Sequence, residues 1–113
     1  MKVETDAQQV TVFVNSTDQW HGRPLYAAVV QVCRDQGVAG ATVSHCFEGY
    51  GAGQELHTTH LLHLAENLPV RIEMVDLPER IGPLLAALDG MIGEGLISVA
   101  DVHIIRYLPD PHS

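Results

Sequence analysis

Apolar and polar positions alternate in four stretches of the chain, and this two-residue period predicts four β-strands. The first strand is marked by three valines whose side chains would share one face: Val10, Val12 and Val14. The other predicted strands cover residues 41–48, 70–75 and 98–107. Pro69 marks the start of the third strand, and prolines follow the fourth.

Two further stretches have the i, i+3, i+4 spacing of an amphipathic helix. The apolar face of the first helix comprises Leu25, Ala28, Val29, Val32 and Cys33. The face of the second comprises Ile81, Leu84, Leu85, Leu88 and Ile92. Pro24 suits the first turn of the first helix, and Gly37 suits its end. Asp76 and Glu79 have the spacing of a capping box at the start of the second helix.

The predicted order of elements is therefore β-α-β-β-α-β. Two right-handed crossovers then give an α+β fold, a ferredoxin-like plait with a four-stranded antiparallel sheet and both helices on one face. Residues 1–113 form one domain by length, with residues 1–8 and 108–113 expected as flexible tails. The other face of the sheet would be open, and apolar residues such as Phe13 and Val75 on it would favour oligomerisation.

Charge and composition limit the classes of function. The chain has six Lys and Arg residues and 14 Asp and Glu residues, which gives a net charge of −8. This negative charge disfavours nonspecific binding to nucleic acids. The chain has no apolar run long enough for membrane insertion and no signal-peptide pattern near Met1, so we expect a cytoplasmic protein. No Ser-His-Asp or Cys-His arrangement is visible, and we expect no enzymatic activity. Cys33 and Cys46 form no paired motif, and Cys33 is expected to be a buried, inert thiol.

Two glycine clusters adjoin predicted elements, and they are the main candidates for a ligand site. The first contains Gly49, Gly51 and Gly53, and the second contains Gly90, Gly93 and Gly95. Glycine allows a backbone to adopt positive φ or to approach a ligand closely, so these clusters are either ordinary turns or places where backbone N–H groups meet an anion.

Four histidines provide an alternative candidate site, for a metal ion. His57, His60 and His63 are spaced by three residues, and His45 lies in the strand before them. Imidazole is a common ligand for zinc, copper and nickel. Neither a helix nor a strand would present all three spaced histidines to one ion, so a site would require an irregular loop or a second subunit. The other reading is a polar loop without metal.

Several segments resemble PII signalling proteins in the right order along the chain. They are residues 37–43, 49–51, 68–75 and 92–97. The combination of Tyr26, Gly40-Ala41-Thr42 and Leu68-Pro69-Val70 is most similar to a PII-like branch called domain-of-unknown-function family 190.

The resemblance implies a homotrimer with adenine nucleotides bound between subunits. It places Thr42 beside the adenine and Gly90, Gly93 and Gly95 around the phosphates. It also implies that Gly49, Gly51 and Gly53 lead into a mobile loop, residues 52–67, which signals to a partner such as a membrane transporter or an enzyme. Trimers of the CutA type share the fold and are linked to metals, which keeps the histidine alternative open.

The chain departs from the PII pattern at two phosphate-binding positions. Leu96 stands where PII proteins carry a lysine, and Arg106 is the only arginine near the end of the last strand, where they carry two. Charge-assisted contacts to phosphate are the strong ones, so triphosphate affinity should be low. AMP, ADP or a cyclic nucleotide is therefore expected rather than ATP. A module that forms trimers and binds no small ligand is a third reading.

Overall fold

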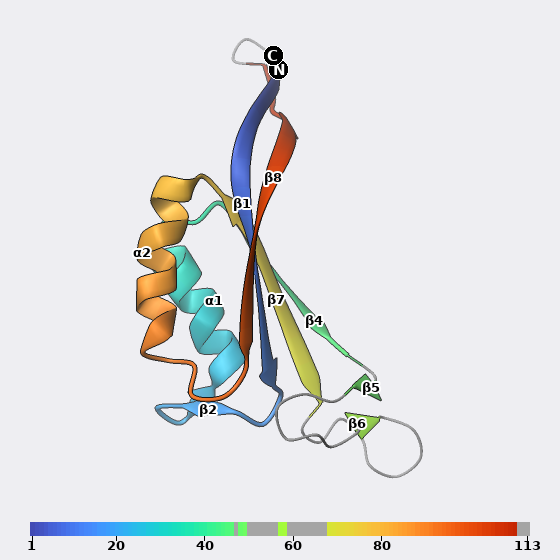
Figure 1. Cartoon of the computed structure of the whole chain (residues 1–113), viewed down its shortest axis with the longest axis vertical. Helices are drawn as coiled ribbons and strands as arrows, with labels where there is room; N and C mark the ends of the chain where they lie inside the picture. Colours follow the sequence, from blue (N-terminus) through green and yellow to red (C-terminus); the bar gives the residue numbers. More distant parts are fainter. Residues whose placement is uncertain (47, 50–56, 59–67, 111–113) are drawn as a thin grey trace.

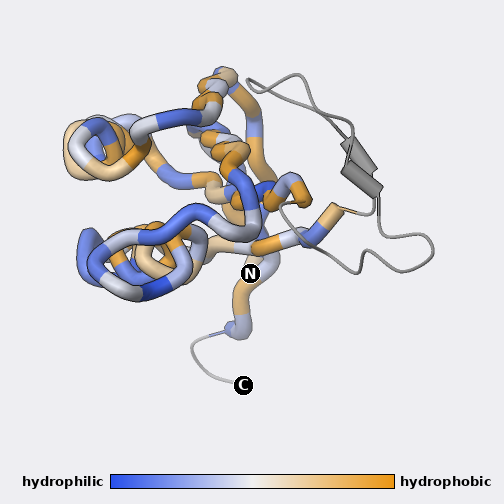
Figure 2. Tube along the Cα trace, turned by 90° about the horizontal axis from the view of Figure 1, so that it is seen from below, coloured by the Kyte–Doolittle hydropathy of each residue, from blue (hydrophilic) through white to orange (hydrophobic). Residues whose placement is uncertain are grey.

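The main sheet of the protein has four antiparallel strands in the order β4-β7-β1-β8. The structure is a computed structural model, and it describes residues 1–46, 48–49, 57–58 and 68–110. The strands are β1 (Lys2–Asn15), β4 (Ala41–His45), β7 (Pro69–Asp76) and β8 (Leu96–Tyr107). Helices α1 (Leu25–Asp35) and α2 (Pro78–Asp89) both lie on one side of this sheet (Figures 1 and 2). The plait predicted from the sequence is confirmed.

Two short ribbons accompany the main sheet. β2 (Gln19–Trp20) pairs with β3 (Arg23–Pro24) just before α1, and β5 (Glu48–Gly49) pairs with β6 (His57–Thr58). The β2–β3 turn contains two residues with positive φ, His21 at 50° and Gly22 at 80°. Such a turn is typical of a tight two-residue hairpin.

The hydrophobic core lies between the sheet and the helices. In β1, Val10, Val12 and Val14 are buried, and the register places them opposite Met74, Ile72 and Val70 of β7. The helices contribute the buried side chains of Leu25, Val29, Cys33, Ile81, Leu84 and Leu88. Burial raises the pKa of the Cys33 thiol, in agreement with an unreactive core residue. No described helix is both long and apolar enough to cross a membrane.

The N-terminal segment is a strand and not the expected flexible tail. Residues 2–7 pair with residues 102–107, beyond the last β7 residue, Asp76, which pairs with Gln8. This two-stranded extension, the arm, projects past the helices and contains the start of β1 and the end of β8 (Figure 1). At its tip, the backbone N–H of Leu108 donates to the carbonyl oxygen of Met1 at 2.8 Å.

The start of α2 also differs from the predicted capping box. Leu77 is the N-cap residue and makes no side-chain capping bond. The carboxylate of Asp76, one residue earlier, accepts from the backbone N–H of Leu77 at 2.7 Å and from that of Ala39 at 3.0 Å. Asp76 therefore ties the start of α2 to the loop that precedes β4, because its side chain reaches across the fold as well as along the chain.

Candidate functional site

The loop between α2 and β8, residues 90–95, contains the second glycine cluster and is called the glycine loop below. Gly90 caps α2, and the backbone N–H groups of Met91 and Ile92 both donate to the carbonyl oxygen of Leu88. The N–H groups of Gly93 and Glu94 make no hydrogen bond within the described part of the chain. N–H groups without such partners are the kind of donor that an anion site requires.

A pocket of about 400 Å³ lies between the glycine loop and the β2–β3 ribbon, and we call it the Trp20 pocket. Its walls are Asp18, Gln19, Trp20, Leu25, Gly90, Met91, Ile92, Gly93 and Glu94. Two of these residues are acidic and none is basic. The pocket thus brings Trp20 next to Gly90 and Gly93, a juxtaposition that the sequence does not indicate.

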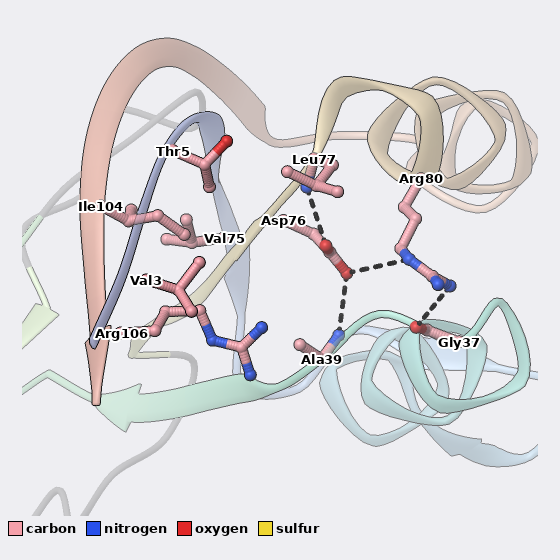
Figure 3. Close-up of a pocket in the computed structure, with 10 residues that line it drawn as sticks. All are labelled: Val3, Thr5, Gly37, Ala39, Val75, Asp76, Leu77, Arg80, Ile104 and Arg106. Carbon is pink, nitrogen blue, oxygen red and sulfur yellow. Dashed lines mark hydrogen bonds and ion pairs between the residues drawn. The ribbon is translucent and has the colours of Figure 1, made fainter. Parts of the chain in front are cut away.

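A larger pocket of about 660 Å³ lies under the arm, and we call it the arm pocket (Figure 3). Val3, Thr5, Ile104 and Arg106 line it from the arm, and the other walls are Gly37, Ala39, Val75, Asp76, Leu77 and Arg80. Arg106 extends toward Ala39 (Figure 3) and forms no ion pair within the described residues. Its guanidinium is consequently free to bind an anion.

Asp76 organises one side of the arm pocket. Besides the backbone N–H groups of Leu77 and Ala39, its carboxylate faces the guanidinium of Arg80, with Nε 3.9 Å from Oδ2. Arg80 in turn donates from Nη1 to the carbonyl oxygen of Gly37 at 3.2 Å. Sequence analysis missed Arg80 as part of a pocket. Arg80 lies in α2, four residues after Asp76 at the end of β7, and this spacing is the signal that could have indicated the pair.

Arg106 lies at the far end of β8 from the glycine loop. Leu96, next to the loop, pairs with Phe13 in β1, whereas Arg106 pairs with Val3 near the tip of the arm. Ten residue steps in an extended strand span roughly 33 Å. One copy of the chain therefore cannot bring Arg106 and the glycine loop to the same small ligand.

Thr42 lies on the opposite edge of the sheet from the glycine loop. It is exposed on β4 and pairs with Glu73 of β7, which pairs with Thr11 of β1, which pairs with Ser98 of β8. Three strand spacings separate Thr42 from Ser98, or roughly 14 Å. Thr42, which is predicted to contact the adenine, and the glycine loop, which is predicted to contact the phosphates, are thus on different edges of the sheet in one copy.

The remaining candidates are only partly described. Gly49 lies in β5, whereas Gly51, Gly53 and most of the 52–67 segment are outside the described residues.

The histidine alternative is likewise only partly covered. His45 is exposed and its ring contacts the ring of Tyr26 edge-on, with centroids 5.1 Å apart. The backbone of His57 lies in β6, and His60 and His63 are outside the described residues. Within the part of the chain that the structure describes, no three His, Cys, Asp or Glu side chains are grouped to hold a metal ion.

A cluster on the outside of the arm was not identified from the sequence. His103 Nδ1 lies 3.2 Å from Asp6 Oδ1, and Nε2 lies 3.2 Å from Glu4 Oε1. The hydrogen bond with Asp6 and then that with Glu4 raise the pKa of His103. The alternation of Glu4 and Asp6 was the available signal, but it becomes informative only once residues 2–7 are known to be a strand.

Comparisons with known proteins give one family and one fold. Residues 7–104 match the family DUF190, described as Uncharacterized ACR. A UPF0166 protein of Aquifex aeolicus is 32% identical over 94 residues, which cover 83% of this chain and 89% of the relative. A UPF0166 protein of Methanocaldococcus jannaschii is 31% identical over 101 residues, covering 88% of this chain and 93% of the relative.

Among solved structures, the protein resembles CPII of Thiomonas intermedia K12, a nitrogen regulatory PII-like protein bound to ADP, AMP and bicarbonate. The TM-score is 0.69 at 16% sequence identity, with 90% of this chain and 91% of that chain covered. This likeness establishes a PII-like fold.

Proposed function

The chain belongs to the DUF190 family and has a PII-like fold, and we propose that it is a regulatory protein that binds an adenine nucleotide between the copies of a homotrimer. The observation that carries this proposal is the separation of Arg106 from the glycine loop along β8. Two potential phosphate ligands that are roughly 33 Å apart in one copy can serve one nucleotide only if they come from neighbouring copies.

The phosphate end of the proposed site combines two kinds of donor. The N–H groups of Gly93 and Glu94 have no partner within the described residues, and they would donate to phosphate oxygens. Arg106 from the next copy would add a charge-assisted, bidentate contact. Leu96 adds no charge, so one guanidinium suits AMP, ADP or a cyclic nucleotide better than ATP.

The base end of the proposed site is the exposed β4 edge. Thr42 is exposed there, and its hydroxyl can both donate and accept a hydrogen bond, as an adenine edge requires. Gly49, Gly51 and Gly53 would complete the site where β4 leads into the 52–67 segment. The ADP and AMP bound to Thiomonas CPII make these two nucleotides the first to test.

Signalling would follow from a change in the 52–67 segment when nucleotide binds. A ligand shifts such an equilibrium only by its difference in affinity for the two states. The segment follows β4 and β5 in the chain, and we expect a nucleotide beside Thr42 to affect it through these strands. The proposed partner is a membrane transporter or a cytoplasmic enzyme, and the protein itself would act in the cytoplasm without catalysing a reaction.

Calorimetry with AMP, ADP, cyclic AMP and ATP tests the proposal. We expect saturable heat with at least one of the first three and weaker binding of ATP. Arg106→Gln should weaken binding at least ten-fold, because it removes the one positive charge among the described residues proposed for the phosphate site. Arg34→Gln, which removes an exposed arginine on α1, is the matched control and should bind as the unaltered protein does. Absence of binding to all four nucleotides would refute the proposal.

A further inference from the structure

The charged side chains that line the Trp20 pocket are acidic and favour a cation. Asp18 and Glu94 line it, and no Lys or Arg side chain does. The pocket also includes Gly90, the residue that caps the C-terminus of α2. The C-terminal end of a helix carries a partial negative charge, and the last turn of α2 contains no basic residue to offset it. Three sources of negative potential therefore meet in one pocket.

The same pocket has apolar walls and one large aromatic ring. Leu25, Met91 and Ile92 provide the apolar surface beside the half-buried indole of Trp20. Indole is the side chain that binds cations best through its π face, and this attraction increases when the cation is partly desolvated. An inorganic ion would gain nothing from such walls, whereas an alkylated ammonium group would bury its methyl groups against them.

The β2–β3 ribbon fixes Trp20 in this place. Trp20 pairs with Arg23 across a tight turn, and its ring centroid lies 4.4 Å from that of His21. The carboxylate of Asp18 accepts from the backbone N–H of Asn15 at 2.9 Å, which holds the segment before the ribbon. In Figure 1, β2 lies next to the chain that leaves α2 for β8. The aromatic and acidic walls are thus positioned before any ligand arrives.

We propose that the Trp20 pocket binds a small organic cation with an alkylated ammonium group. The ammonium would lie against the indole of Trp20, and Glu94 and Asp18 would supply the opposing charge. This site needs neither Arg106 nor Thr42, although it shares Gly90, Gly93 and Glu94 with the glycine loop of the nucleotide proposal.

The probe is choline, and the signal is the fluorescence of Trp20, the only tryptophan in the chain. The titration is done without nucleotide at pH 8, with sodium chloride adjusted to constant ionic strength. We expect a saturable change with choline. Its neutral carbon isostere, 3,3-dimethylbutan-1-ol, should bind at least ten-fold more weakly, because it has the same shape without the charge.

Glu94→Gln is the variant that tests the role of the pocket, since Glu94 is exposed on a loop and its amide analogue should fold. We expect it to weaken choline binding at least three-fold. Glu79→Gln makes the same change at the other end of α2 and should leave binding unaltered. Three results would each overturn the inference. They are equal binding of choline and its isostere, equal binding of choline by the Glu94 and Glu79 variants, and no saturable response to choline.

Discussion

The carbonyl oxygen of Phe13 lies only 2.5 Å from the position that a Cβ atom on Gly95 would occupy. Gly95 also has φ of +153°, a conformation that residues with a side chain rarely adopt. The glycine loop therefore enters β8 in close contact with the β1 backbone. This contact determines where the free N–H groups of Gly93 and Glu94 lie relative to the sheet.

Gly95→Ala should destabilise the protein by about 1–3 kcal/mol, because the new methyl group meets a backbone atom and the residue is conformationally strained. Chemical denaturation of the purified protein measures the change. Gly93→Ala is the control, since nothing lies within 4 Å of its added Cβ, and it should change stability by less than about 0.5 kcal/mol. Equal effects of the two substitutions would contradict the close approach of Gly95 to Phe13.

Asp76 should matter more for stability than Arg80, although the two are paired. Asp76→Ala leaves the N–H groups of Leu77 and Ala39 without their acceptor and should cost about 1–3 kcal/mol. Arg80→Ala removes an exposed partner and should cost less than about 1 kcal/mol. A double-mutant cycle measured by denaturation separates the pair energy from the backbone bonds. A larger loss for Arg80→Ala than for Asp76→Ala would contradict this account, because both variants lose the ion pair and only Asp76→Ala also loses the bonds from Leu77 and Ala39.

The arm should be more ordered in mild acid than at alkaline pH. Neutral imidazole can donate only one hydrogen bond, so both Asp6 and Glu4 are satisfied only when His103 is protonated. The raised pKa of folded His103 means that protonation favours the folded arm. This stabilisation is complete below the ordinary histidine pKa of about 6.5 and disappears as the pH rises through the raised value.

An NMR titration of the histidine ring protons measures this effect directly. His103 should titrate at a higher pH than an ordinary histidine, and Asp6→Asn should lower its pKa more than Glu4→Gln does, because the bond with Asp6 contributes most. Unchanged titration of His103 in both variants would mean that the cluster does not form in solution.

The sequence predicted the helices and central strands because each has one buried face. Val10, Val12 and Val14 alternate for that reason, and the apolar spacing of α1 and α2 reflects the same core. The N-terminal strand of the arm was missed, whereas residues 102–107 fall within the predicted 98–107 strand. Exposed Glu4 and Asp6 alternate with Thr5 and Ala7, but only Ala7 is buried, so the alternation is weak. Residues 2–7 form a strand through backbone pairing with β8, and this pairing joins residues about 100 positions apart in the chain.

The candidate site was predicted in its parts but not in its arrangement. Gly93 and Arg106 stand out in the sequence as residue types suited to phosphate, yet the register that separates them along β8 depends on the whole sheet. The Trp20 pocket escaped prediction for a similar reason. Trp20 and Gly90 are 70 positions apart in the chain, and only the fold brings the β2–β3 ribbon to the end of α2.

Mixed oligomers provide the most direct test of the central claim, that one nucleotide is held by Arg106 of one copy and the glycine loop of another. One variant is Arg106→Gln. The other is Gly93→Glu, which places a negative charge in the loop where nothing lies within 4 Å. Each variant alone should bind AMP or ADP at least ten-fold more weakly than the unaltered protein in calorimetry.

Coexpressed in equal amounts, the two variants should regain binding at about a quarter of the interfaces of a cyclic trimer, with the affinity of the unaltered protein. These are the interfaces in which an intact Arg106 meets an intact glycine loop. A site shared between copies would be contradicted if the mixed oligomers bound no more nucleotide than the separate variants. The unaltered protein must bind normally in the same experiment.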